Sequence, residues 1–176
     1  MANIFTNPGP ANDYFVYDMT PRYEGGFTSN FNFRDWSLSV FFHFTKQRGL
    51  SATTSAGFPG SMNNQPSIIL DHWRKPGDIT DVGRLTTFAT TNGYNYYYYS
   101  DASLCDASYI RLQNLSLAYE LPEKWRKKAG VGNFKIYVQC ENLFLITNYE
   151  GIDPETQNFG GLPRPRVLTA GLSCNL

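Results

Sequence analysis

The side chains of this chain that could do chemistry are few and widely spaced. Asp71, Asp78 and Asp81 could bind calcium through their carboxylates, but their spacing is not that of an EF-hand loop. The two histidines, His43 and His72, have no neighbours that would complete a metal-binding or catalytic set, so a structural role is the favoured interpretation. The sequence also lacks the motifs of serine hydrolases, zinc proteases, P-loop proteins and dinucleotide-binding proteins. We therefore predict no enzyme, no metal site and no cofactor.

Cysteines and charges exclude further classes of protein. The cysteines are odd in number and widely spaced, at Cys105, Cys140 and Cys174, which indicates neither a disulfide framework nor a zinc site. The chain has 15 basic and 15 acidic side chains, so it has no global attraction to nucleic acid, which is not an expected partner. A basic cluster over residues 124–128 could contact phosphate, but a solvated turn is the favoured interpretation.

Aromatic side chains in polar segments are the stronger candidates for binding. An aromatic ring with a polar group suits contact with a sugar ring or a protein partner. In a β-barrel the same side chains can instead pack a loop or belong to the interfacial aromatic girdle, and the sequence leaves these alternatives open. The predicted ligand or partner contacts are Trp73, Tyr96, Tyr97, Tyr98 and Tyr99.

Strands are the elements that must position these residues, because five segments alternate apolar and polar side chains. The alternation predicts strands near 26–34, 36–45, 109–121, 133–142 and 166–176. At about ten residues each, they are longer than the usual strand of a globular protein. Ile110 and Leu112 are out of phase with Leu115 and Leu117, which predicts a bulge near Gln113. A proline at 122 and a glycine at 130 predict a short helix between the third and fourth strands.

The connections between these strands alternate between short and long. A turn of about two residues joins the first pair and a short helix joins the third and fourth strands, whereas the loops 46–108 and 142–166 are long. In a meander this places both long loops at one end of the sheet, which is the layout of outer-membrane barrels with short periplasmic turns and long extracellular loops. We therefore predict an all-β fold: an antiparallel β-meander of five long strands, one face of which contacts lipid.

The predicted lipid-facing side chains are the apolar members of each alternation. They are Phe31, Phe33, Trp36, Leu38, Val40, Phe42, Leu117, Ile136, Val138, Leu168, Leu172 and Leu176. No run approaches the roughly 18 apolar residues of a membrane-spanning helix. A transmembrane barrel must close, and the smallest closed ones have about eight strands, so five strands indicate an open part of a larger barrel.

Four segments carry a specific resemblance. They are residues 20–27 (TPRYEGGF), 73–81 (WRKPGDITD), 109–122 (YIRLQNLSLAYELP) and 139–155 (QCENLFLITNYEGIDPE). In this order they closely resemble the C-terminal end of SusC/RagA-type TonB-dependent outer-membrane transporters. The resemblance covers nearly the whole chain, so residues 1–176 are identified as the C-terminal part of a barrel of about 22 strands.

The resemblance implies a location and a set of partners. It implies an importer for oligosaccharides, peptides or other nutrients in the outer membrane of a Gram-negative, Bacteroidetes-like cell. The implied partners are the rest of the barrel and its plug, a SusD-like surface lipoprotein, membrane lipid and the TonB system. Because the plug and TonB box of such transporters lie N-terminal to the matched region, the chain is not expected to transport alone. The alternative is a secreted carbohydrate-binding β-sandwich, whose two sheets would bury their apolar faces against each other.

Overall fold

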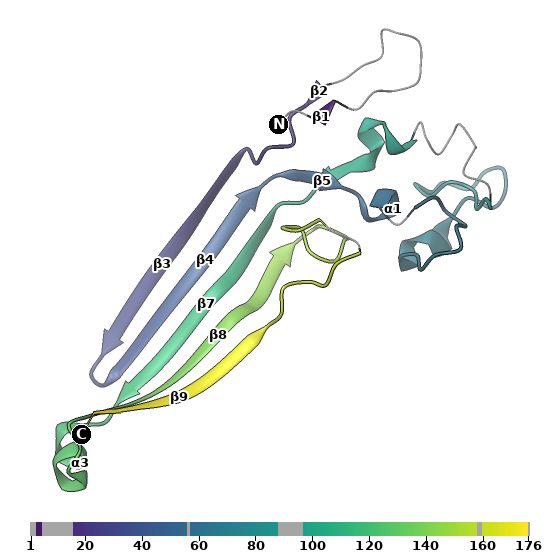
Figure 1. Ribbon diagram of the computed structural model, residues 1–176. Coiled ribbons are helices and arrows are strands. Elements are labelled where there is room, and N and C mark those ends of the chain that lie inside the picture. Colours follow the sequence, from purple (N-terminus) through teal and green to yellow (C-terminus); the bar gives the residue numbers. More distant parts are fainter. Residues whose placement is uncertain (1–2, 5–15, 56, 88–96, 158–159, 176) are drawn as a thin grey trace. The chain divides into compact units, whose positions relative to one another are not determined.

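The structure is a computed structural model that describes residues 3–4, 16–55, 57–87, 97–157 and 160–175 (Figure 1). Two compact units make up the chain. The sheet unit comprises Tyr23–Thr45, Tyr109–Thr147 and Arg164–Leu176. The loop unit comprises Met1–Arg22, Lys46–Ser108 and Asn148–Pro163.

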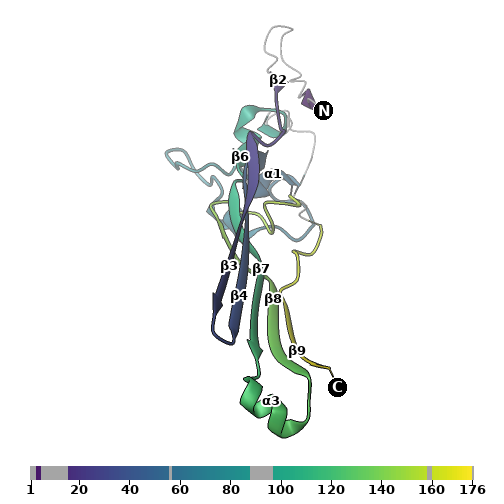
Figure 2. The ribbon, with the colours of Figure 1, turned by 90° about the vertical axis from the view of Figure 1, so that its left-hand side faces the viewer.

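The sheet unit is built on one antiparallel sheet of five long strands in the order β3-β4-β7-β8-β9 (Figure 1). Figure 2 shows these strands as a single layer. The predicted fold class, an all-β meander with one short helix, is confirmed. The strands are β3 (Tyr23–Phe33), β4 (Trp36–Lys46), β7 (Tyr109–Glu120), β8 (Asn133–Thr147) and β9 (Val167–Asn175).

The predicted bulge is present in β7. The pairing of β4 with β7 skips Gln113, because Phe41 lies opposite Asn114 and Phe42 lies opposite Leu112. The same irregularity continues into the pairing of β7 with β8, where Asn142 adopts a φ of 53°. An extra residue in one strand reverses the phase of the side chains. Leu112 therefore lies on the same face as Leu115, although the sequence places these two residues out of phase.

Two strand boundaries differ from those predicted. Strand β3 begins at Tyr23 rather than near 26, because the rings of Phe44 and Phe41 pack over Gly25 and Gly26 and fill the space that a side chain would take. Strand β8 ends at Thr147 rather than near 142. Pairing with β7 resumes beyond the irregularity at Asn142 and continues to Thr147.

Both long connections leave the sheet at the same end. Tyr109 pairs with Thr45 and with Thr147, so β4 and β8 end, and β7 begins, at one level of the sheet. At the other end, residues 34–35 join β3 to β4. Helix α3 (Glu123–Ala129) joins β7 to β8 there, between an N-cap at Pro122 and a left-handed C-cap at Gly130. This topology agrees with the alternation of short and long connections in the sequence.

The described elements of the loop unit are short. Strand β1 (Asn3–Ile4) pairs with β2 (Val16–Tyr17), and β5 (Arg48–Leu50) pairs with β6 (Leu104–Asp106). The unit also contains helix α1 (Ala52–Ser55) and the 3-10 helices η1 (Ser67–Asp71) and η2 (Asp101–Ser103). Among the described residues, no helix is long and apolar enough to cross a bilayer.

Side-chain hydrogen bonds to the backbone connect the two long connections within the loop unit. The Gln47 amide donates from Nε2 to the carbonyl of Pro154 at 2.7 Å and to that of Ala107 at 3.3 Å. The Tyr149 hydroxyl donates to the carbonyl of Leu50 at 3.0 Å. Buried backbone carbonyls need such partners when they lie outside a strand ladder. These contacts give the unit an ordered core although it has little regular secondary structure.

Candidate functional site

The apolar side chains of four strands form rows across one face of the sheet, which we call the apolar face. In a strand, side chains that lie opposite each other on paired strands share a face. Of the rows that span β4, β7, β8 and β9, the one nearest the short turns consists of Trp36, Tyr119, Ile136 and Leu172; the pair Phe134 and Cys174 lies one step beyond it. The next rows are Leu38, Leu117, Val138 and Ala170; then Val40, Leu115, Cys140 and Leu168; then Phe42, Leu112 and Phe144; and last Phe44, Ile110 and Ile146.

Strand β3 adds aromatic side chains to the apolar face. Gly25 faces the ring of Phe44, because a Cβ built at Gly25 would lie 2.7 Å from the Cζ of Phe44. Alternate residues of a strand share a face. Phe27, Phe31 and Phe33 therefore lie on the same face as Phe44. Of the predicted lipid-facing residues, only Leu176 lies outside the described residues; the others share this face.

The apolar face is largely uncovered in this chain. Phe33 is 69% exposed, Leu172 is 69% exposed and Leu168 is 74% exposed. The five rows are two residues apart, so they extend about 26 Å along the strands at about 3.3 Å per residue. This length is of the same order as the apolar band of about 25 Å on transmembrane barrels. An exposed apolar patch of this extent requires lipid or protein to cover it.

An aromatic pair marks the end of the apolar face beside the short turns. The rings of Trp36 and Tyr119 lie 4.7 Å apart between centroids and are tilted by 43°. Trp36 is the first residue of β4, directly after the turn, and is 48% exposed. Tryptophan and tyrosine concentrate where an apolar layer meets water, because each has an apolar body and a polar group. The pair thus has the composition of an interfacial girdle.

The opposite face of the sheet is mainly polar. His43 and Arg111 lie opposite each other on β4 and β7, and the Tyr109 hydroxyl lies 3.3 Å from Nδ1 of His43. The Arg111 guanidinium lies over the ring of Tyr109 at 5.6 Å from its centroid. Gln139 reaches Asn114 across β8 and β7 at 3.5 Å. An antiparallel sheet with one apolar and one polar face is the arrangement of a barrel wall between lipid and a polar interior.

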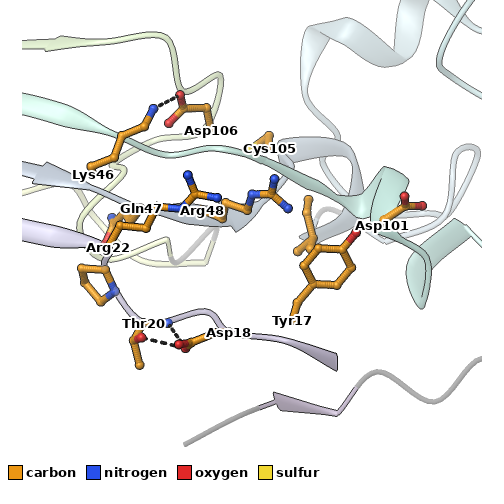
Figure 3. Close-up of a pocket in the computed structure, with 12 residues that line it drawn as sticks. Tyr17, Asp18, Thr20, Arg22, Lys46, Gln47, Arg48, Asp101, Cys105 and Asp106 are labelled. Carbon is orange, nitrogen blue, oxygen red and sulfur yellow. Dashed lines mark hydrogen bonds and ion pairs between the residues drawn. The ribbon is translucent and has the colours of Figure 1, made fainter. Parts of the chain in front are cut away.

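A cavity of about 950 Å³ lies in the loop unit between residues 17–22, 46–48 and 101–106 (Figure 3). Both signs of charge line it. The Arg48 guanidinium lies over the ring of Tyr17, 5.4 Å from its centroid, and Arg22 contributes a second guanidinium. The Asp18 carboxylate accepts hydrogen bonds from the backbone and the hydroxyl of Thr20, which lower the pKa of Asp18. Such a lining suits a polar ligand, and sequence reasoning missed it because its residues are far apart in the chain.

An ion pair fixes one wall of this cavity. Lys46 Nζ lies 2.6 Å from Oδ2 of Asp106. The hydrogen bond from Lys46, followed by one from the hydroxyl of Ser108, lowers the pKa of Asp106 from 3.8 to about 2. Both side chains are partly exposed, so the pair stabilises the fold by at most about 1 kcal/mol.

This ion pair predicts a pH-dependent contribution to stability. Because the pKa of Asp106 is depressed in the folded chain, the contribution is present above pH 4 and is lost as pH falls toward 2. We expect Lys46→Met to raise the pKa of Asp106 toward 3.8, as measured by NMR titration of its carboxyl carbon in detergent-solubilised chain. The pKa of Asp18, which is lowered by Thr20, is the internal control and should not move. An Asp106 pKa that stays near 2 in the variant would contradict the role given to Lys46.

Two other perturbed groups in the loop unit are structural. Burial raises the pKa of Tyr149 to about 12, with smaller contributions from Cys105 and Asp153. Burial also raises the pKa of the Cys105 thiol, and the negative charges of Asp106 and Glu150 raise it further. A thiol with a raised pKa stays protonated at neutral pH and is a poor nucleophile. The three cysteines are free thiols.

The predicted aromatic contacts lie in two places in the loop unit, and Tyr96 is outside the described residues. Trp73 is half-buried, and its backbone N–H donates to the carbonyl of Val82 at 2.9 Å. The rings of Tyr98 and Tyr99 meet edge to face at 5.0 Å, and Tyr99 is exposed. Among the described residues, no ring contact joins Trp73 to Tyr97, Tyr98 or Tyr99. Their contact with a ligand or partner stays a prediction.

The aspartates and the loop histidine have structural contacts. Asp78 Oδ2 accepts hydrogen bonds from the backbone N–H groups of Arg74 and Lys75, both at 3.0 Å, and so holds a tight turn. Nδ1 of His72 lies 3.1 Å from the carbonyl oxygen of Ile69. Within the described part of the chain, no three metal-ligating side chains come together.

These observations define a class of protein. Five long antiparallel strands, an uncovered apolar face with an aromatic pair at one end and a polar opposite face are typical of the wall of an outer-membrane β-barrel. No family model matches the chain. The chain is, however, similar to curated TonB-dependent receptors.

TonB-dependent receptor P3 of Formosa agariphila is 27% identical to it over an alignment of 173 residues, which covers 90% of this chain and 17% of that protein. TonB-dependent receptor SusC of Bacteroides thetaiotaomicron is 34% identical over an alignment of 82 residues, which covers 45% of this chain and 8% of that protein. The resemblance predicted from the sequence is thereby confirmed. The chain spans less than a fifth of the length of either relative.

Solved structures agree on the fold. The match to the RagAB peptide importer in its open-open state covers 97% of this chain and 19% of the importer chain, with a TM-score of 0.72 and 23% identity. The closed-closed state matches 96% of this chain with the same TM-score and 24% identity. The sheet is thus superimposable on part of a TonB-dependent receptor barrel, as the predicted fold class requires.

Proposed function

We propose that this chain forms part of the wall of an outer-membrane TonB-dependent importer for oligosaccharides, peptides or similar nutrients. The apolar face carries the proposal, because it presents rows of bare apolar side chains over a length comparable with a bilayer core. The similarity to TonB-dependent receptors supports it.

The sheet edges support a role within a larger barrel. Strands β3 and β9 are the two outer strands of the sheet, and among the described residues no further strand pairs with either of them. In hydrocarbon, unpaired backbone N–H and C=O groups are unfavourable by several kcal/mol each. The sheet is therefore proposed to continue into further strands at both edges, so that the barrel closes.

The topology supports an orientation. Both long connections leave one end of the sheet, and the hairpin at 34–35 and α3 lie at the other. In outer-membrane barrels the short turns face the periplasm and the long loops face outward. We propose that the loop unit is extracellular, where its cavity and the exposed Tyr99 would meet nutrient or a SusD-like surface lipoprotein, and that energy comes from the TonB system.

The two competing functions have less support. A carbohydrate-binding sandwich needs two facing sheets, whereas the five long strands lie in one sheet. An enzyme needs a positioned nucleophile or acid–base pair. In the cavity, Lys46 and Asp106 are paired with each other, and the raised pKa of Cys105 keeps its thiol protonated. We therefore propose transport and not catalysis.

A tryptophan reporter tests the lipid-facing assignment. The chain has three tryptophans, so Trp73→Phe with Trp125→Phe leaves Trp36 as the only one. The variant is placed in its natural sequence context, so that the sheet can pair at both edges, and tryptophans outside this chain are replaced by phenylalanine. When this protein is refolded with phospholipid vesicles, lipids brominated near the headgroup should quench its fluorescence, because Trp36 lies at the end of the apolar face. The variant that retains only Trp73, in the loop unit, is the control and should not be quenched. Equal quenching of the two variants would refute a lipid-facing sheet.

A further inference from the structure

Helix α3 presents an exposed aromatic side chain next to two lysines. Trp125 is 68% exposed, and Lys124 and Lys128 are exposed as well. The helix is short but well defined, because Pro122 begins it and Gly130 ends it with a φ of 67°. Tryptophan is enriched where a membrane meets water, because its ring is apolar and its N–H is polar.

The orientation of α3 is set by Arg126. Its Nη1 donates to the carbonyl of Gly132 at 2.9 Å and lies 3.4 Å from Oδ1 of Asn133 at the start of β8. Arg126 thus turns toward the chain. At 100° per residue, Lys124 and Lys128 lie on the opposite side of the helix, one turn apart, and Trp125 lies beside them. These three residues form an outward surface, which we call the α3 surface.

The α3 surface carries unpaired positive charge. Lys127 lies at 2.7 Å from the Glu123 carboxylate, so these two charges offset each other. Among the described residues, no carboxylate pairs with Lys124 or Lys128. The surface therefore combines two free ammonium groups with one indole ring.

We propose that the α3 surface binds anionic phospholipid headgroups where the barrel wall meets the periplasmic leaflet. The inference rests on the proposed function, because it requires the sheet to lie in a membrane. Helix α3 follows β7 three residues after its end at Glu120, so the α3 surface lies at the end of the sheet where Tyr119 pairs with Trp36. Indole rings are favoured among headgroups, and each lysine near an anionic surface is attracted to it.

The test uses the same natural sequence context, with Trp125 as the only tryptophan, obtained in this chain by Trp36→Phe with Trp73→Phe. The variant is refolded with vesicles of phosphatidylethanolamine, either alone or mixed with phosphatidylglycerol, that carry lipid brominated near the headgroup. We expect stronger quenching of Trp125 in the anionic vesicles. Lys124→Gln and Lys128→Gln should each raise the lipid concentration for half-quenching about fivefold, which corresponds to about 1 kcal/mol per charge. Lys75→Gln, which removes a lysine of the loop unit, is the matched control.

The outcomes separate this inference from the proposed function. If Trp36 is quenched and Trp125 is not, the α3 surface does not bind lipid, whereas the lipid-facing sheet stands. The inference would also be overturned if the quenching of Trp125 were the same with and without phosphatidylglycerol and unchanged by Lys124→Gln and Lys128→Gln, because headgroup charge would then play no part. If neither tryptophan is quenched, both proposals are overturned.

Discussion

Leu168→Arg is expected to destabilise the membrane-inserted barrel by about 2–4 kcal/mol. Leu168 is 74% exposed on the apolar face and lies in its middle row, opposite Cys140. A guanidinium there would be held among apolar side chains of the face proposed to contact hydrocarbon. The measurement is the fraction of folded, heat-modifiable protein in outer-membrane preparations from cells that express the protein in its natural sequence context.

Two further variants make this prediction specific. Thr169→Arg is the matched control, because Thr169 pairs with Gln139 on the polar face, where an arginine can remain solvated. Leu172 lies near the short turns, opposite Ile136. Leu172→Arg should destabilise the inserted barrel by only about 0–1 kcal/mol, because the arginine there can reach the headgroups. The expected order of damage is thus Leu168→Arg, then Leu172→Arg, then Thr169→Arg. If Thr169→Arg is as damaging as Leu168→Arg, the assignment of the two faces is wrong.

Gly60→Ala is expected to destabilise the loop unit locally by about 2–4 kcal/mol. Gly60 has a φ of 93°, which L-residues rarely adopt, and a Cβ there would lie 2.6 Å from the carbonyl oxygen of Thr86. The neighbouring backbone cannot move away easily, since the Thr86 N–H donates to Pro59 and the Gln65 side chain bridges Gly60 and Phe58. Faster hydrogen exchange of the Thr86 amide would report the loss.

Gly77→Ala separates the two causes of this effect. Gly77 has a similar φ of 98°, but a Cβ there would meet no atom within 4 Å. Its replacement should therefore cost only the backbone strain, about 1–2 kcal/mol in the turn that Asp78 holds. If exchange in the turn around Gly77 increases as much as exchange at Thr86 does in Gly60→Ala, then the contact with Thr86 contributes nothing, and backbone conformation alone explains both results.

Much of the sheet could be predicted from the sequence because its determinants are local. Alternation with period two identifies a strand whichever strand it pairs with, and the reversal of phase between Leu112 and Leu115 locates the bulge. The proline at 122 and the glycine at 130 bound α3, because proline fits the start of a helix and glycine adopts the left-handed C-cap. The same alternation placed the described apolar residues on one face.

Other features depended on partners that are distant in the chain. Gly25 and Gly26 look like a strand end until the rings of Phe44 and Phe41 cover them. The cavity brings residues 17–22 together with 46–48 and 101–106, and no local pattern predicts that juxtaposition. The tie between Gln47 and Pro154 is of the same kind, since it joins residues 107 positions apart.

The sequence by itself thus determined the five strands, their two faces and the end of the sheet from which each long connection leaves, because side-chain alternation and connection length are properties of the chain alone. Only the tertiary structure decided where β3 begins, where β8 ends and which residues line the cavity. The physical reason is that these features depend on contacts between segments far apart in the sequence. Such contacts are set by packing and hydrogen bonding, not by local propensity.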